Sequence, residues 1–150
     1  MKKVLFLCTG NSCRSQMGEV VMNVIGKGRY QAFSAGAAPA GYVHPTAIKV
    51  MKEAKFPTDG LRSKSWDEFK GQEFDLIITV CDNAKQNCPV WPGTPQLIHW
   101  SFEDPAKVEG AESHKLEAFR KVMSEMQQRI RLLLSFPDDR FNEYKVKTAS

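Results

Sequence analysis

Residues 8–15 combine a potential nucleophile with groups that can bind an oxyanion. They read Cys-Thr-Gly-Asn-Ser-Cys-Arg-Ser, with five residues between Cys8 and Arg14. An arginine guanidinium can hold two oxygens of one ligand, and its positive charge favours the thiolate form of a neighbouring cysteine. We therefore expect Cys8 to have a lowered pKa and to attack a tetrahedral oxyanion.

The elements around these residues would place them in a ligand-binding turn. Residues 4–7 form an apolar run typical of a buried parallel strand, and apolar residues recur at helical spacing over positions 17–24. Residues 8–14 then connect strand to helix, where backbone N–H groups converge beside a helix N-terminus. Gly10 allows backbone conformations that a residue with a Cβ atom resists. The residues expected to bind the oxyanion are Thr9, Gly10, Asn11, Ser12, Cys13, Arg14 and Ser15.

The longer string over residues 8–16 carries more information than the Cys8–Arg14 spacing. That spacing alone also fits a buried thiol that acts as a small hydrophobe at a strand end. The full string resembles the loop of the low-molecular-weight tyrosine phosphatase superfamily, and it is closer to the thioredoxin-coupled arsenate reductases of that superfamily. The resemblance covers roughly residues 3–134. It implies an enzyme that reduces arsenate to arsenite in arsenic detoxification.

The length and composition of the chain fit one soluble domain. The 150 residues carry a net charge of +4, and no apolar run approaches the roughly 20 residues that span a membrane. No basic stripe or signal peptide is visible, so we expect a cytoplasmic protein that binds neither nucleic acid nor membrane. In that reducing compartment, the 4 cysteines favour catalysis or metal binding over structural disulfides. We expect a catalytic domain over residues 1–135 and a C-terminal tail over residues 136–150.

Strand-like and helix-like segments alternate along the chain. Strands are predicted at residues 4–7, 31–34, 74–80 and 96–100, and helices after residue 14, from residue 44, at 65–69 and at 113–134. This alternation predicts an α/β fold with a four-stranded parallel sheet flanked by helices in three layers. Ligands bind at the carboxyl ends of the strands in such a fold. The resemblance implies the same low-molecular-weight tyrosine-phosphatase-like architecture.

Cys81 and Cys88 form a second group of reactive residues. Cys81 follows the predicted strand over residues 74–80, at the same edge of the sheet as Cys8. Reduction of arsenate needs two electrons, and two thiols supply them by forming a disulfide. The resemblance implies that Cys8 attacks arsenic, that Cys81 attacks Cys8 to release arsenite, and that Cys88 then moves the oxidation to a Cys81–Cys88 disulfide. Residues 82–87 are expected to form a loop or marginal helix that moves during this relay.

Other roles for the cysteines are open at this stage. Cys8, Cys13, Cys81 and Cys88 could bind zinc, but their spacings are loose and the oxyanion loop would be left unused, so we expect no metal site. Cys88 could be incidental, although Asn-Cys-Pro matches the reductase pattern. Cys13 is expected to point into the core. The chain could also be a low-molecular-weight tyrosine phosphatase whose extra cysteines protect Cys8, or a protein that binds an anion or metal without catalysis.

The third motif supplies a candidate general acid. Residues 99–105 read His-Trp-Ser-Phe-Glu-Asp-Pro and resemble the family's His-Trp-Gly-Phe-Asp-Asp-Pro. The resemblance makes Asp104 the acid that protonates the leaving oxygen, a role typically worth about 10²–10⁴-fold in rate. Asp104 could instead cap the turn before Pro105. Ala106 stands where the phosphatases have tyrosine, which favours a small inorganic anion over phosphotyrosine and leaves room for a slow phosphatase side activity.

Four residues are candidates for supporting the loop from behind. Some reductases of this branch hold a potassium ion there through Asn, Glu, Ser and Asp, and the first three match Asn11, Glu19 and Ser34. Lys64 stands where the Asp would be. We hypothesise that its ammonium replaces the cation, pairs with Glu19 and stiffens Asn11. An exposed lysine without this role is the alternative.

The partners follow from the resemblance and from the paired thiols. The substrate would be arsenate, with phosphate or sulfate as mimics, and we expect no tightly bound cofactor. The Cys81 and Cys88 pair favours thioredoxin as the external reductant, although glutaredoxin or a low-molecular-weight thiol could serve. We expect the protein to be a monomer.

Overall fold

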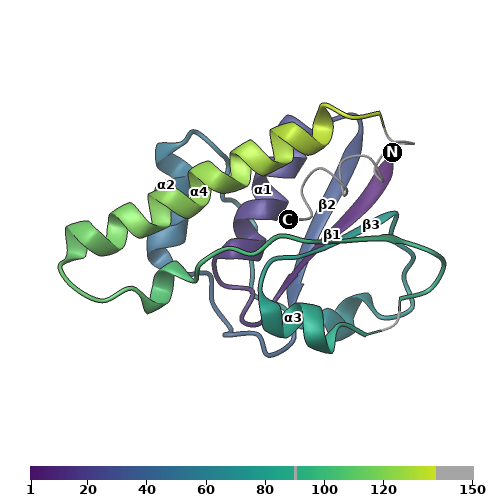
Figure 1. The fold of residues 1–150 in the computed structure, drawn as a ribbon, viewed down its shortest axis with the longest axis horizontal. Coiled ribbons are helices and arrows are strands. Elements are labelled where there is room, and N and C mark those ends of the chain that lie inside the picture. Colours follow the sequence, from purple (N-terminus) through teal and green to yellow (C-terminus); the bar gives the residue numbers. More distant parts are fainter. Residues whose placement is uncertain (90, 138–150) are drawn as a thin grey trace.

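Four parallel strands form the central sheet of the protein (Figure 1). The computed structural model describes residues 1–89 and 91–137. The strands are β1 (Lys2–Cys8), β2 (Tyr30–Gly36), β3 (Leu76–Thr79) and β4 (Gln96–His99), in the order β2-β1-β3-β4. Each neighbouring pair is parallel, which confirms the predicted four-stranded parallel sheet.

The helices lie where the sequence predicts them, with small shifts at their ends. They are α1 (Arg14–Ile25), α2 (Pro45–Glu53), α3 (Asp82–Asn87) and α4 (Glu112–Leu134), and short 3₁₀ helices span Trp66–Phe69 and Pro105–Lys107. α4 packs against both α1 and α2, so these three helices lie together, while α3 lies apart from them (Figure 1). Among the described residues, no helix has the length and apolar character needed to cross a membrane.

The two faces of the sheet are covered differently because side chains alternate along a strand. Phe6 of β1 lies against Gly18 of α1, where an added Cβ would come within 2.5 Å of the ring. The preceding residue, Leu5, points to the opposite face and pairs with Phe33 of β2. The ring of Phe33 packs on that of Phe69 at 5.7 Å between centroids. The second face is therefore covered by connecting segments that carry aromatic rings.

The carboxyl ends of β1 and β3 lie side by side. Leu7 pairs with Thr79, and the backbone N–H of Val80 donates to the Leu7 carbonyl at 2.9 Å. Both strands are buried on both faces, which explains their continuous apolar sequences. Cys8 and Cys81, which lie at these strand ends, therefore emerge at the same edge of the sheet.

The end of α4 is held by Arg29. The Arg29 guanidinium donates hydrogen bonds to the carbonyl oxygens of Leu134 and Phe136, at 2.7 Å and 2.5 Å. Residues 138–150, most of the predicted tail, lie outside the described residues. The division of the chain at residue 135 stays a prediction.

Candidate active site

The loop after β1 turns sharply at Asn11. Asn11 has φ 48°, in the left-handed region, and its side chain is fixed by hydrogen bonds from Nδ2 to the hydroxyls of Ser15 (2.7 Å) and Ser34 (3.0 Å). Asparagine tolerates this region because its short polar side chain bonds locally. The expectation that Gly10 supplies the special conformation is wrong, since Gly10 has no positive φ and has room for a Cβ.

A different glycine allows the loop to approach the sheet. A Cβ added to Gly36, the last residue of β2, would lie 2.4 Å from the carbonyl oxygen of Thr9 and 3.0 Å from the backbone nitrogen of Asn11. Any side chain at this position would push the loop away. No local pattern around Gly36 predicts this role, because Gly36 and the loop are far apart along the chain.

Cys8 lies at the centre of the loop and is 3% exposed. Its sulfur is 2.8 Å from the Ser15 hydroxyl oxygen, and the Asn11 backbone N–H donates to it at 3.1 Å. Burial raises the pKa of the Cys8 thiol, and these hydrogen bonds together with the charge of Arg14 only oppose that rise. The expected lowered pKa is therefore wrong for this structure: desolvation of the thiolate outweighs the groups that stabilise it.

Cys13 occupies the N-cap position of α1 without capping it. It is buried, as the sequence predicts, and burial also raises the pKa of its thiol. Ser15 is buried as well. Its hydroxyl contacts the Cys8 sulfur and accepts a hydrogen bond from the Asn11 side chain. Burial thus disfavours the thiolate form of Cys13.

Arg14 connects the loop to the candidate acid. Its Nη1 donates to the carbonyl of Phe102 at 3.1 Å, and its Nη2 lies 3.6 Å from Oδ2 of Asp104. Asp104 also accepts a hydrogen bond from the Ala106 backbone N–H at 3.0 Å, so it caps the short helix that begins at Pro105. The capping interaction and the contact with Arg14 coexist, and they place a carboxyl beside the guanidinium of the loop.

The second thiol lies against the loop. Cys81 is buried, and its sulfur is 3.3 Å from the hydroxyl oxygen of Thr9, the residue after Cys8. Cys81 and Cys88 occupy the two ends of α3, at its N-cap and C-cap positions. Cys88 is half-buried, and the four cysteines are all free thiols. The predicted marginal segment between them is this single short helix.

Lys64 lies among the candidate support residues. Its side chain is 8% exposed, and its ammonium is 3.4 Å from Glu19 Oε1, 3.4 Å from the Ser34 hydroxyl and 3.1 Å from the Arg62 carbonyl. Its backbone N–H donates to Asn11 Oδ1 at 3.0 Å. The alternative of an exposed lysine is wrong. The Lys64 ammonium thus lies among three oxygen atoms behind the loop.

Gln16 is a loop contact that sequence reasoning missed. It is fully buried, and its side-chain nitrogen donates to the carbonyl oxygens of Asn11 and Arg62, at 3.0 Å and 2.8 Å, and contacts Asn11 Oδ1. It thereby ties the loop to the segment that carries Lys64. Its place in the string over residues 8–16 was the one signal available.

Sequence reasoning also assigned no role to His99, because the spacing of the histidines along the chain does not mark them as ligands. Its Nδ1 lies 2.8 Å from the Thr79 hydroxyl and its Nε2 lies 3.1 Å from Asp82 Oδ1. Thr79 and His99 are paired across β3 and β4, and Asp82 is the first residue of α3. The chain of three polar side chains fastens α3 to the sheet directly beside Cys81.

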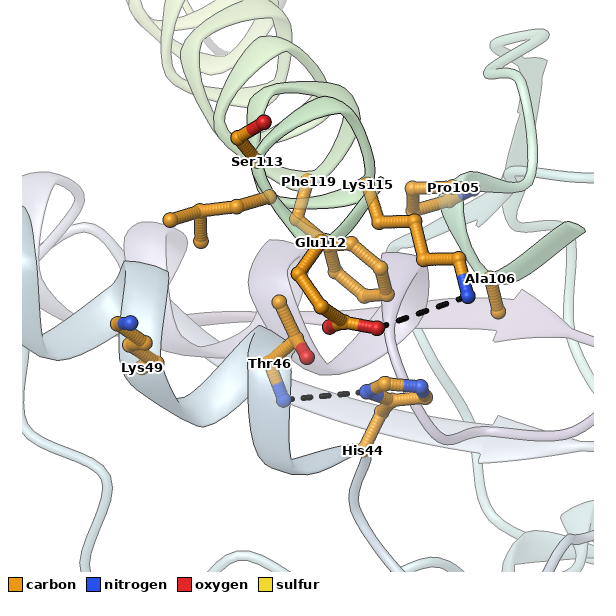
Figure 2. A pocket seen from close by; sticks show the side chains of 10 residues that line it. His44, Thr46, Lys49, Pro105, Ala106, Glu112, Ser113, Lys115 and Phe119 are labelled. Carbon is orange, nitrogen blue, oxygen red and sulfur yellow. Dashed lines mark hydrogen bonds and ion pairs between the residues drawn. The ribbon is translucent and has the colours of Figure 1, made fainter. Parts of the chain in front are cut away.

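A hollow of about 390 Å³ opens beside the acid-bearing segment (Figure 2). Ala106 lines it together with the N-terminal turns of α2 and α4. Figure 2 shows the ring of His44 accepting a hydrogen bond from the Thr46 backbone N–H, and Glu112 paired with Lys115. Ala106 presents only a methyl group here, so the aromatic wall expected of a tyrosine phosphatase is not formed by this residue.

The described residues contain no cluster of three or more histidine, cysteine or acidic side chains that could hold a metal ion. Cys8 and Cys81 instead make separate contacts, the former with Ser15 and Asn11 and the latter with Thr9. The structure thus places two thiols, Cys8 and Cys13, in the loop and a third, Cys81, at its edge.

Known proteins are similar to this chain in sequence and in fold. The family model for low molecular weight phosphotyrosine protein phosphatase matches residues 3–146. An arsenate reductase of Halalkalibacterium halodurans is 40% identical over 130 residues, which cover 87% of this chain and 93% of that protein. A solved arsenate reductase in the phosphate binding state has a TM-score of 0.77 and 33% identity, covering 90% of this chain and 98% of that one. The low molecular weight protein tyrosine phosphatase of T. tengcongensis has a TM-score of 0.73 and 26% identity, covering 90% and 99%. The chain therefore belongs to the low molecular weight phosphotyrosine protein phosphatase family, and it is similar to arsenate reductases over most of its length.

Proposed function

We propose that the protein reduces arsenate to arsenite by an intramolecular relay of three thiols, Cys8, Cys81 and Cys88. The observation that carries the proposal is the contact between the Cys81 sulfur and the hydroxyl of Thr9, at 3.3 Å. It puts a second buried thiol against the residue that follows the nucleophile. A phosphatase needs one thiol, whereas a two-electron reduction needs two.

In the first step, Cys8 forms a bond to arsenic and one oxygen leaves as water. Burial raises the pKa of the Cys8 thiol, so its proton must be removed as it attacks, and a dianionic oxyanion in the loop is a base that can accept it. Asp104, beside Arg14, is the group that protonates the leaving oxygen. The Arg14 guanidinium and the backbone N–H groups of the loop would balance the negative charge.

In the second step, the Cys81 thiolate attacks the sulfur of Cys8. A Cys8–Cys81 disulfide forms, the sulfur–arsenic bond breaks, and its electron pair stays on arsenic, which leaves as arsenite. Two thiols are thereby oxidised by two electrons in total, and As(V) becomes As(III).

In the third step, Cys88 attacks Cys81 and releases Cys8 as a thiolate. Cys81 and Cys88 are seven residues apart at the two ends of α3, which corresponds to about 10 Å along a helix. Bridged cysteines have Cα atoms within about 7 Å of each other. We therefore infer that α3 unwinds when the Cys81–Cys88 disulfide forms.

An external dithiol protein would reduce that disulfide. Cys88 is the more accessible of the two thiols, and thioredoxin is the reductant we favour over glutaredoxin or a low-molecular-weight thiol. Such a cycle requires the reducing conditions of the cytoplasm, where we place the protein.

Lys64 would take the place of a bound cation behind the loop. Its contacts with Glu19 and Ser34, and its backbone bond to Asn11, support that role. Turnover should then be the same in potassium and in sodium at equal ionic strength. A much faster rate in potassium would contradict this assignment.

The test is arsenate-dependent oxidation of NADPH with thioredoxin and its reductase. We expect multiple turnovers for the wild type and none for Cys8→Ser, Cys81→Ser or Cys88→Ser. If the wild type gives no arsenate turnover, and p-nitrophenyl phosphate is cleaved equally by wild type, Cys81→Ser and Cys88→Ser, the protein is a phosphatase. The family match, which extends over residues 3–146, makes that second function the one to test against.

A further inference from the structure

Trp91 has a buried indole N–H that lacks an acceptor among the described residues. Its side chain is 5% exposed, and its indole nitrogen donates no hydrogen bond within the part of the chain that the structure describes. The ring packs edge-on against Phe74, with centroids 5.8 Å apart and planes at 90°. A buried N–H without a partner costs free energy, so such groups are rare and call for an explanation.

The thiol of Cys88 is the candidate acceptor for this indole. Cys88 ends α3 and lies three residues before Trp91. Burial raises the pKa of the Cys88 thiol, and a side-chain interaction with Trp91 opposes that rise. A neutral thiol is a weak acceptor, whereas a thiolate is a strong one. The indole donor is therefore best satisfied when Cys88 is ionised.

We propose that Trp91 is a positioning residue for the third thiol, and that its indole N–H donates a hydrogen bond to the Cys88 thiolate. The thiolate is the form that attacks Cys81: a Cys88–Cys81 bond forms, the Cys8–Cys81 bond breaks, and Cys8 leaves as a thiolate with no net gain or loss of electrons. The catalytic part of this inference rests on the proposed relay. The interaction between Trp91 and Cys88 does not.

The first experiment measures the reactivity of Cys88 against pH in the reduced full-length protein. Alkylation by iodoacetamide is followed cysteine by cysteine with mass spectrometry. Loss of one hydrogen bond to a charged group lowers the thiolate population about tenfold. In Trp91→Phe we expect the midpoint of the Cys88 profile to rise by about one pH unit, with Cys8 unchanged. The matched control Trp66→Phe alters a partly buried tryptophan of another segment and should leave Cys88 unchanged.

The second experiment needs no substitution of the tryptophan. The indole N–H resonance of Trp91 is followed by ¹H–¹⁵N NMR as the pH is raised, among the signals of the 3 tryptophans. We expect it to move with the same midpoint as Cys88 alkylation in the wild type and to stay fixed in Cys88→Ser. A resonance that does not move, or that moves equally in both proteins, overturns the proposal.

The consequence for the relay is measured by quenching single turnovers with acid. A tenfold smaller thiolate population is partly offset because a thiol of higher pKa gives a more nucleophilic thiolate. We expect conversion of the Cys8–Cys81 disulfide to Cys81–Cys88 to slow about threefold in Trp91→Phe. If Cys88→Ser has no effect on arsenate turnover, the relay is wrong, whatever the NMR result. If the relay holds and Trp91→Phe does not change the Cys88 profile, the role of Trp91 is wrong.

Discussion

The hydroxyl oxygen of Thr9 lies 3.3 Å from the sulfur of Cys81, although the two residues are 72 positions apart. The contact exists because β1 and β3 are neighbouring parallel strands that end at the same level. It places a thiol that the phosphatase reaction does not need beside the residue that follows the nucleophile.

Removing this hydroxyl should slow the second step. In Thr9→Val we expect formation of the Cys8–Cys81 disulfide to be about tenfold slower, because a hydrogen bond to the attacking thiolate is lost. The rate is measured by rapid quench in a Cys88→Ser background, where that disulfide is not passed on. Ser63→Ala is the matched control, since Ser63 bonds the Gly10 carbonyl in the same loop. An equal slowing in both variants would mean that the loop, not the thiolate contact, matters.

Lys64→Met should destabilise the protein. The substitution removes the positive charge that pairs with the Glu19 carboxylate, which is 17% exposed and keeps its hydrogen bond from Ser34, and breaking such an ion pair costs about 3 kcal/mol. Urea denaturation at pH 7 measures the change. Lys70→Met removes an exposed pair with Asp67 at 2.8 Å and should cost about 1 kcal/mol or less. Similar losses for the two variants would contradict a structural role of Lys64.

Stability should fall at alkaline pH because of the buried thiols. Burial raises the pKa of Cys13 above its ordinary value of 9.0, so between the two pKa values the unfolded chain has released a proton that the folded chain retains. The free energy of unfolding then decreases with rising pH, by about 1.4 kcal/mol per pH unit for one thiol. Urea denaturation from pH 8 to 10, with reductant, should give a steeper fall for wild type than for Cys13→Ala. Equal slopes would contradict the shift.

His99→Gln should loosen α3. The substitution disrupts the link from Thr79 through His99 to Asp82, and the loss of one net hydrogen bond makes opening about tenfold more frequent. Hydrogen exchange of the amides of residues 83–87 at pH 7 measures it. His114→Gln, on the exposed start of α4, is the control and should not change these rates. Unchanged exchange in His99→Gln would show that the link does not hold the helix.

Ala106→Tyr should improve the cleavage of aryl phosphates. Ala106 is exposed beside Asp104 and lines the hollow next to the acid segment, so a ring at this position can pack against an aromatic leaving group. We expect kcat/KM for p-nitrophenyl phosphate to rise several-fold, about 1 kcal/mol of stacking, while arsenate turnover stays unchanged. Lys107→Tyr places the ring one residue further along and serves as the control. A gain in both variants would mean that position 106 has no special role.

The order of strands and helices was predictable because it depends on local periodicity. The apolar runs of β1 and β3, and the helical spacing in α4, each reflect burial of one element against its neighbours. The string from Cys8 to Ser15 likewise contains a candidate nucleophile and a cation, so the prediction of an oxyanion loop could be made from sequence alone, and it stays a prediction. The motif around Asp104 predicts a general acid, and that role stays a prediction; the structure shows that the Asp104 carboxylate lies 3.6 Å from Arg14.

The tertiary structure decided what depends on segments distant in sequence. Burial of Cys8 reverses the pKa shift that its local neighbours favour, since desolvation comes from the surrounding core rather than from the loop. The room for the loop comes from Gly36 on another strand. The burial of the Trp91 indole comes from its packing on Phe74, which is 17 residues earlier in the chain. The sequence by itself determined which chemical groups the protein has and in which elements they lie. Their charge states and partners follow from the fold, because solvation and hydrogen bonding are set by whatever is packed around a side chain.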